Sequence, residues 1–175
     1  MSFEYIPIDE QLNLIQLQPD QAEKLFELTD NNRDYLGEFL PWVPEVKEIK
    51  DSRVHIEETI VNRESNTTYT YGIEYEGEIV GDISLRNMNS ASRPPEIGYW
   101  TAANYAGKGL TTRAVQALTN LGIETLQLSK IIIRANPDNL ASNRVAEKAG
   151  YMLVDHEVEN GENLNVWSLT NHTLL

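Results

Sequence analysis

Residues 104–112, NYAGKGLTT, constrain the fold of this 175-residue chain more than any other stretch. Gly107 and Gly109 flank Lys108 in this loop, and the run before it, residues 95–101, is typical of a strand. The apolar residues that follow lie at helical spacing: Leu110, Ala114, Ala117, Leu118 and Leu121. The first N–H groups of such a helix have no partner inside it, and the helix dipole adds partial positive charge there. A bare loop at that position therefore predicts an anion site.

Two well-known phosphate loops do not fit this stretch. A P-loop requires Ser or Thr directly after its lysine, whereas Gly109 follows Lys108. A dinucleotide-binding fingerprint requires a third glycine where this sequence has Thr112. From the loop alone, a tight turn that uses its glycines only for backbone geometry is an equal alternative.

Hydrophobic periodicity divides the rest of the chain into strands and helices. Strands are predicted at residues 12–18, 68–76, 79–86, 95–101, 130–136, 151–159 and 163–170, and helices at 19–36, 51–65, 110–121 and 139–150. Asp20, then Asp51 or Ser52, and finally Asn139 are the expected N-caps of the first, second and last helices. Antiparallel hairpins beside a β-α-β unit predict an α/β (α+β) fold, with one domain over residues 1–175, a mixed sheet and helices on both faces.

The charge balance and the absence of cysteine exclude several function classes. The chain has 14 Lys and Arg against 27 Asp and Glu, a net charge of −13, which disfavours nucleic acid as a partner. An acidic surface suits either solubility alone or a basic protein, peptide or polyamine partner. Without cysteine there is no disulfide or thiol nucleophile, and His55, His156 and His172 lack the spacing of a metal site. No apolar run suits a membrane span and no secretion signal is visible, so a cytoplasmic location is expected.

The glycine loop and its neighbouring segments resemble a known family. The GNAT superfamily of acetyl-CoA-dependent N-acetyltransferases carries Gln/Arg-x-x-Gly-x-Gly/Ala at this place, and this sequence reads NYAGKG, with Asn104 instead of Gln or Arg. The segments EIGYW, GLTTRAVQAL, KIIIRAN and NLASNRVAEKAGY support the resemblance, which is close over residues 79–155. With FLPWVPEV near the front, the chain is similar to the RimJ/RimL branch, the ribosomal-protein N-terminal acetyltransferases.

The resemblance implies a GNAT-like sheet of about seven mostly antiparallel strands, in which two parallel strands, 96–101 and 130–136, splay apart. The pantetheine arm of acetyl-CoA is expected between them, served by backbone groups near Tyr99, Trp100 and Thr101, with core packing as the alternative for Trp100. Backbone N–H groups of the loop are expected to cradle the CoA pyrophosphate, at Ala106, Gly107, Lys108, Gly109, Leu110 and Thr111. The family needs no metal and often forms homodimers.

Four side chains are candidates for the chemistry and the acceptor site. The resemblance places Asn139 on the pantetheine arm and Ser142, on the inward helix face, near the sulfur as proton donor to the thiolate. Helix capping and a local bond to helix carbonyls are their respective alternatives. Glu96 is expected to act as base, often through water, or to be a solvated carboxylate at a strand end. Trp42 is expected either to wall the acceptor cleft or to pack in the core.

Amine pKa values favour one class of acceptor over another. A free α-amine has a pKa near 7.7–8.0, so about 10–20% of it is neutral at pH 7, against about 0.04% of a lysine amine. The modest base candidates therefore favour a protein N-terminal α-amine, and the RimJ/RimL resemblance implies that a ribosomal protein carries it. Direct attack in a ternary complex is expected, because no cysteine can carry the acetyl group. Small-molecule amines or polyamines are the second class of acceptor. A non-catalytic acyl-CoA-binding or sensor domain on the same scaffold is the other interpretation.

Overall fold

The computed structural model describes residues 3–172 and contains an eight-stranded sheet in the order β1-β2-β3-β4-β5-β6-β8-β7. The strands are β1 (Tyr5–Pro7), β2 (Leu12–Ile15), β3 (Tyr69–Tyr75), β4 (Glu78–Arg86), β5 (Glu96–Thr101), β6 (Lys130–Ala135), β7 (Met152–Glu159) and β8 (Glu162–Thr170). Neighbours are antiparallel except β5 and β6, which are parallel. This confirms the predicted mixed sheet. The sequence pattern missed β1, because its three residues are too few to show an alternation.

The helices within the described residues are α1 (Ala22–Asp30), α2 (Arg33–Gly37), α3 (Ile49–Glu64), α4 (Leu110–Asn120) and α5 (Leu140–Lys148). Short helical turns accompany them at Pro19–Gln21, Val43–Glu45, Ala103–Tyr105 and Leu121–Thr125. The predicted helix at 19–36 is divided at Asn31 and Asn32, a residue type that favours turns. Asn32 Nδ2 donates to the Leu28 carbonyl at 2.8 Å and so satisfies a group at the end of α1. Asp20 lies inside the turn before α1 and does not cap it.

The two later helix starts show one confirmed cap and one correction. Asn139 caps α5 as predicted, because its Oδ1 accepts the Ser142 backbone N–H at 3.2 Å. By contrast, α3 begins at Ile49, two residues earlier than predicted. Asp51 lies in its first turn, where Oδ2 accepts the backbone N–H of Glu48 at 2.9 Å. Asp51 therefore supports the start of α3 from within, as the third residue of a capping box does.

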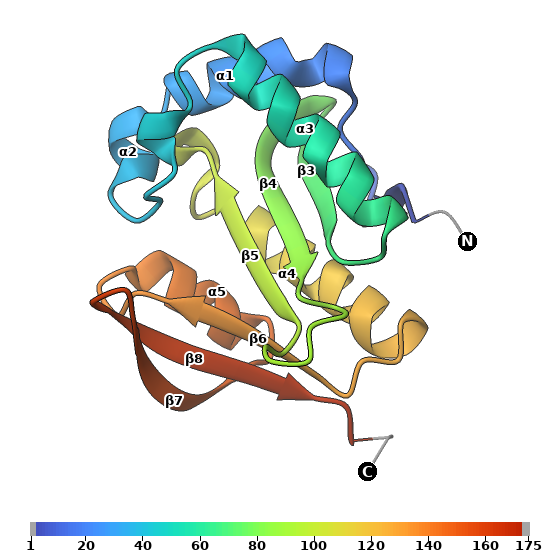
Figure 1. Cartoon of the computed structure of the whole chain (residues 1–175), viewed down its shortest axis with the longest axis vertical. Helices are drawn as coiled ribbons and strands as arrows, with labels where there is room; N and C mark the ends of the chain where they lie inside the picture. The colour runs from blue at the N-terminus through green and yellow to red at the C-terminus, as the bar shows by residue number, and fades with distance from the viewer. Residues whose placement is uncertain (1–2, 173–175) are drawn as a thin grey trace.

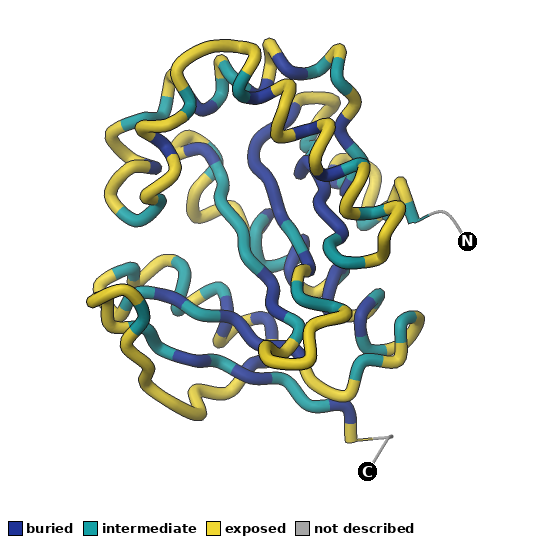
Figure 2. Tube along the Cα trace, in the orientation of Figure 1, coloured by how far each residue is buried: buried dark blue, intermediate teal, exposed yellow. Residues whose placement is uncertain are grey.

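Helices cover both faces of the sheet, as predicted (Figure 1). On one face α4 and α5 pack over the larger core cluster, with Leu110, Ala114 and Leu118 of α4 buried. On the other face α1 and α3 enclose a smaller cluster that includes Leu25 and Ile56. Figure 2 shows buried residues concentrated in the central strands, while the edge strand β7 is exposed along nearly its whole length. None of the helices in residues 3–172 combines the length and apolar character of a membrane span.

β5 and β6 meet at one end and then separate, which opens the sheet. Their register pairs Glu96 with Ile132, and from there the two strands spread apart (Figure 1). Each keeps a partner on its outer side, β5 with β4 and β6 with β8. The facing backbone groups beyond the pair are therefore available to an extended ligand. The splayed parallel pair is confirmed, and Ile131, Ile132 and Ile133 are buried, as predicted for β6.

Candidate active site

The glycine loop between β5 and α4 is open to an approaching ligand. Gly107 and Gly109 have φ values of +76° and +73°, in the left-handed region that glycine adopts without strain. A Cβ added at either position would meet no atom within 4 Å, so the space outside the loop is free. Gly109 directly precedes α4, and residues 106–109 are exposed. Backbone N–H groups at an open helix N-terminus suit the phosphate groups of a nucleotide.

Side chains around the loop fix its position. Thr101, at the end of β5, and Thr111, in the first turn of α4, share a hydrogen bond of 2.6 Å between their hydroxyl oxygens. Lys108 Nζ lies 5.1 Å from the ring centroid of Tyr105 and 5.9 Å from that of Tyr75. These contacts hold the loop to the strands beside it and leave main-chain groups at its mouth. The contact of the loop with the CoA pyrophosphate stays a prediction.

A cleft of about 770 Å³ opens where β5 and β6 diverge. Residues from both strands, from β4, α3 and α5 and from the segment after α2 line it, among them Trp42, His55, Asp82, Arg86, Gly98, Tyr99, Trp100, Arg134, Asn139 and Ser142. The cleft therefore brings together four predicted site residues, Trp42, Trp100, Asn139 and Ser142. Glu96 lines a smaller cavity that shares some of the same residues. Thr101 and residues 106–111 lie outside the lining of either cavity.

Ser142 lies in the cleft wall and pairs with Tyr99 of β5. Its Oγ donates to the Tyr99 hydroxyl at 3.2 Å, and that hydroxyl donates to the Ser142 carbonyl at 2.8 Å. Burial raises the pKa of Tyr99 to about 12, against the opposing hydrogen bond from Ser142, so the phenol keeps its proton at neutral pH. Sequence reasoning named Tyr99 for its backbone alone and missed its hydroxyl, although the alternation of β5 puts this side chain on the strand face opposite Glu96. These two hydrogen bonds therefore hold both hydroxyls in place, where α5 meets β5.

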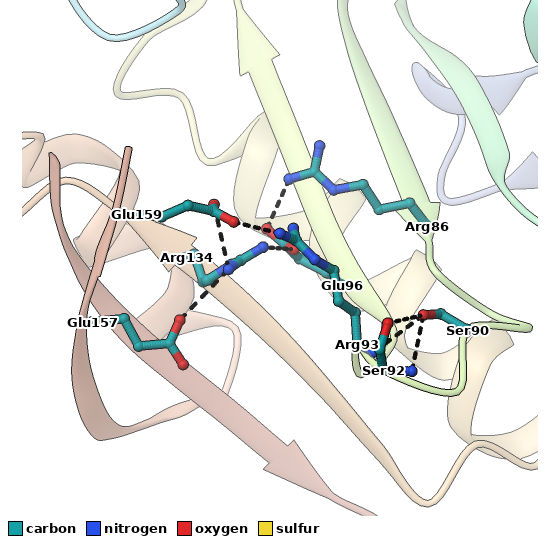
Figure 3. A network of polar contacts seen from close by, with 8 residues as sticks. All are labelled: Arg86, Ser90, Ser92, Arg93, Glu96, Arg134, Glu157 and Glu159. Carbon is teal, nitrogen blue, oxygen red and sulfur yellow. Dashed lines mark hydrogen bonds and ion pairs between the residues drawn. The ribbon is translucent and has the colours of Figure 1, made fainter. Parts of the chain in front are cut away.

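Glu96 is a buried carboxylate between two arginines (Figure 3). It is 2% exposed; Oε1 accepts from Arg86 at 2.7 Å and Oε2 from Arg134 at 2.8 Å. Arg134 also pairs with Glu157 and Glu159, each at 3.5 Å. Burial opposes ionisation of Glu96, but the two arginines outweigh it and hold the pKa of the carboxyl below its usual value. The alternative of a solvated strand-end carboxylate is therefore wrong, because Arg86 lies directly opposite on β4 and Arg134 reaches over from β6.

These ion pairs make Glu96 a weak proton acceptor. The ordinary pKa of a carboxyl lies about 3.5 units below that of an α-amine, so proton transfer between them costs about 5 kcal/mol. The arginines widen that difference, and both carboxylate oxygens already accept hydrogen bonds. The geometry favours an electrostatic role for Glu96, and its role as base stays a prediction.

Trp42 and Trp100 each line the cleft and pack against one another. Their ring centroids are 5.9 Å apart, and Trp42 is 37% exposed. Trp100 also packs on the smaller core cluster under α1 and α3. Trp100 therefore packs on the core while it lines the cleft, and Trp42 lines the cleft and packs on Trp100. The contacts of Trp100 with the pantetheine arm and of Trp42 with the acceptor stay predictions.

The cleft also contains a histidine–aspartate pair that residue spacing in the sequence did not predict. His55 Nε2, on α3, lies 3.4 Å from Asp82 Oδ2, on β4. The hydrogen bond with Asp82 raises the pKa of His55, against the effect of burial. The one available signal was the alternation of Asp82, Ser84 and Arg86, which puts all three on one face of β4. Within residues 3–172, no three acidic or histidine side chains gather as a metal site requires.

Comparison with known proteins decides the family. The sequence model of the acetyltransferase (GNAT) domain matches residues 11–152. The chain belongs to the GNAT acetyltransferase family. It is 27% identical over 150 residues to the ribosomal-protein-serine acetyltransferase of Escherichia coli (strain K12), across 86% of this chain and 84% of that one. It is 32% identical over 149 residues to YdaF of Bacillus subtilis (strain 168), provisionally named a ribosomal N-acetyltransferase, across 83% and 80% of the two chains.

A solved structure of another acetyltransferase shares the whole fold. The microcin C7 self-immunity acetyltransferase MccE, solved with acetyl-CoA and AMP, has a TM-score of 0.88 and 26% identity, with 97% of each chain covered. The GNAT protein described here is an acetyl-CoA-dependent N-acetyltransferase, and its resemblance to the ribosomal-protein acetyltransferases is confirmed. The open glycine loop and the splayed strands fit that co-substrate.

Proposed function

We propose that this enzyme acetylates the N-terminal α-amines of proteins, with a ribosomal protein as acceptor. The observation that carries the proposal is the chemistry of the cleft, whose described bases are carboxylates and one imidazole, that of His55. An imidazole has an ordinary pKa about 1.3 units below that of an α-amine but about 4 units below that of a lysine. Such a base deprotonates an α-ammonium group far more readily than a lysine. The names of the E. coli and B. subtilis relatives, which specify ribosomal acceptors, support the same assignment.

On the donor side, backbone N–H groups of residues 106–111 bind the pyrophosphate of acetyl-CoA. The pantetheine arm then follows β5 beside Trp100 and Thr101 into the gap between the strands. Asn139 lines this path and would bond the arm while it caps α5. The Ser142 hydroxyl, also in the cleft wall, donates a proton to the departing thiolate.

On the acceptor side, the amine enters the gap past Trp42, which forms part of its wall. The neutral nitrogen attacks the thioester carbon directly, so that a carbon–nitrogen bond forms and the carbon–sulfur bond breaks. Glu96 and its arginines contribute a fixed pattern of charge at one end of the cleft. A direct attack needs no acyl-enzyme, in keeping with a chain that has no cysteine.

A polyamine is the second candidate acceptor, and the acidic residues of the cleft favour it. Glu45, Asp51, Glu58 and Asp82 all line the cleft and would attract a polycation. A sensor domain on this scaffold would instead bind acetyl-CoA without turnover. The three alternatives differ in what they do with an amine, so one assay separates them.

The test is an amine panel read by release of the CoA thiol. The panel holds a peptide with a free N-terminal serine, a matched peptide with a blocked N-terminus and one lysine, and spermidine. We expect kcat/KM for the free N-terminus to be at least about tenfold above the other two, given the pKa difference between the amines. Faster turnover of spermidine or lysine would overturn the α-amine proposal. Binding of acetyl-CoA in calorimetry without turnover of any amine would support the sensor.

The predicted homodimer and cytoplasmic location belong to the same proposal. Met152, Val154 and Val158 of β7 are 72%, 57% and 71% exposed, so this edge strand offers apolar side chains to a second copy. Light scattering from the purified enzyme measures this, and a mass of two chains supports the dimer while a mass of one chain contradicts it. An enzyme that acetylates ribosomal proteins would act in the cytoplasm, where ribosomes are assembled and used.

A further inference from the structure

His55 and Asp82 form a pair at the α3 side of the cleft. The 3.4 Å contact joins Nε2 of His55 to Oδ2 of Asp82. The imidazole side chain is 49% exposed and the carboxylate side chain 11%. Since Nε2 faces the carboxylate, Nδ1 is left as the nitrogen that can accept a proton. Asp82 thus orients a base that is open both to the cleft and to water.

The described carboxylates in and beside the cleft suit proton removal less well. Glu96 has both carboxylate oxygens bound by arginines. Glu45, Asp51 and Glu58 line the cleft, but each is a carboxyl group whose ordinary pKa lies far below that of an amine. A general base works best when its pKa is close to the operating pH, and the imidazole of His55 meets that condition.

We propose that His55 is the general base, taking a proton from the acceptor ammonium group, and that Asp82 is its positioning residue. This inference rests on the proposed function, because it requires an amine acceptor in the cleft. His55 belongs to α3 and Ser142 to α5, and these helices cover opposite faces of the sheet. The gap between β5 and β6 therefore has a base on one side and a proton donor on the other.

The protons balance in this arrangement. His55 Nδ1 takes one proton from the ammonium group, which frees the nitrogen lone pair for attack on the thioester carbon. As the carbon–nitrogen bond forms and the carbon–sulfur bond breaks, the thiolate takes the Ser142 hydroxyl proton. The nitrogen's second proton then replaces it on Ser142. The imidazolium returns its proton to water, which its exposure allows.

The charges around His55 favour this role. The charged groups that line the cleft with it are Asp82 and Arg86 from β4, Asp51 and Glu58 from α3, Glu45 from the turn before α3, Arg134 from β6 and Glu162 from β8. The two arginines are already paired with Glu96. The acids attract an ammonium group, and Asp82 raises the pKa of His55 towards that of an α-amine.

The test compares the pH dependence of kcat for the wild type, His55→Gln and His156→Gln. His156 is the matched control, because it lies exposed on β7, bonds Asn165 at 2.8 Å and does not line the cleft. We expect His55→Gln to lower kcat up to about tenfold at pH 7, because about 10–20% of an α-amine is already neutral there. The deficit should shrink to below about twofold near pH 9.5, where an α-amine is neutral without help. His156→Gln should follow the wild type, and Asp82→Asn should move the rising limb to lower pH.

Two results would overturn the inference: a loss in His55→Gln that is the same at every pH, or a profile equal to that of His156→Gln. The acceptor in this test is the peptide with a free N-terminal serine. If the wild type acetylates only spermidine, the α-amine proposal fails, and the same comparison with spermidine still decides the role of His55. If the wild type acetylates no amine, both proposals fall. Binding of CoA by each variant, measured by calorimetry, should match the wild type.

Discussion

Two charged clusters in and beside the cleft each include a residue of β4, and they differ in whether their charge can change in the neutral pH range. The arginine cluster consists of Glu96, 2% exposed, held between Arg86 and Arg134. The histidine pair consists of Asp82 and His55, whose imidazole is 49% exposed. A carboxylate bound by two arginines keeps its charge throughout the neutral range, whereas an imidazole gains or loses a proton within it. We infer that the first cluster serves the structure of the gap and the second serves turnover.

The largest expected effect tests the structural half of this comparison. Arg134→Met should lower the free energy of unfolding by about 3 kcal/mol, because it removes one of the two arginines that neutralise the buried carboxylate of Glu96. Arg93→Met is the matched control, since Arg93 pairs with Glu159 at the surface and is 54% exposed; it should cost below about 1 kcal/mol. Urea unfolding measures both. Equal losses in the two variants would contradict a structural role for the arginine cluster.

The sequence predicted the cofactor end of the site better than the acceptor end. Gly107, Gly109 and the helix after them form one local segment, so their spacing alone predicted a glycine loop at a helix start, which the structure contains. The histidine pair joins residues 27 positions apart, and the contact of Glu96 with Arg134 spans 38. Local periodicity carries no information on such contacts, because the packing of α3 on the sheet creates the first and the register of β5 against β6 creates the second.

The next expected effect concerns Ser142, whose hydroxyl does not change its charge with pH and can therefore be compared with His55, whose imidazole does. Ser142→Ala should lower kcat about 100-fold, because the thiolate loses its proton donor, while the affinity for CoA stays within a factor of two or so. The loss should be nearly the same at every pH, in contrast to that of His55→Gln. Ser65→Ala is the control, since Ser65 Oγ bonds the Asn62 carbonyl on the exposed end of α3. A loss of kcat in Ser142→Ala that disappears at high pH would contradict its role as proton donor and would indicate that Ser142 takes part in removing the amine proton instead.

A smaller effect is expected from the partner of Ser142. Tyr99→Phe removes the hydroxyl that accepts from Ser142 Oγ and donates to its carbonyl. We expect kcat to fall about fivefold, which corresponds to about 1 kcal/mol, the usual worth of one hydrogen bond. Tyr105→Phe, in the glycine loop, keeps its ring contact with Tyr75 and should leave kcat unchanged. A loss as large as that of Ser142→Ala would assign the proton donor to Tyr99 instead.

The smallest expected effect concerns stability: the contributions of Glu96 and His55 should change with pH in opposite directions. It tests the comparison of the two clusters most directly. The pKa of Glu96 is lowered in the folded state, so its ionised form adds stability above the ordinary carboxyl pKa, and this is lost as pH falls through the folded value. The pKa of His55 is raised, so its protonated form adds stability below pH about 6.5, and this is lost as pH rises through the folded value. In urea unfolding, the difference in free energy of unfolding between wild type and Glu96→Gln should therefore become smaller towards pH 3. The corresponding difference for His55→Gln should become smaller as the pH rises from 6 to 9. If both differences narrow in the same direction, the two clusters do not differ in kind, because opposite pKa shifts require opposite pH dependence.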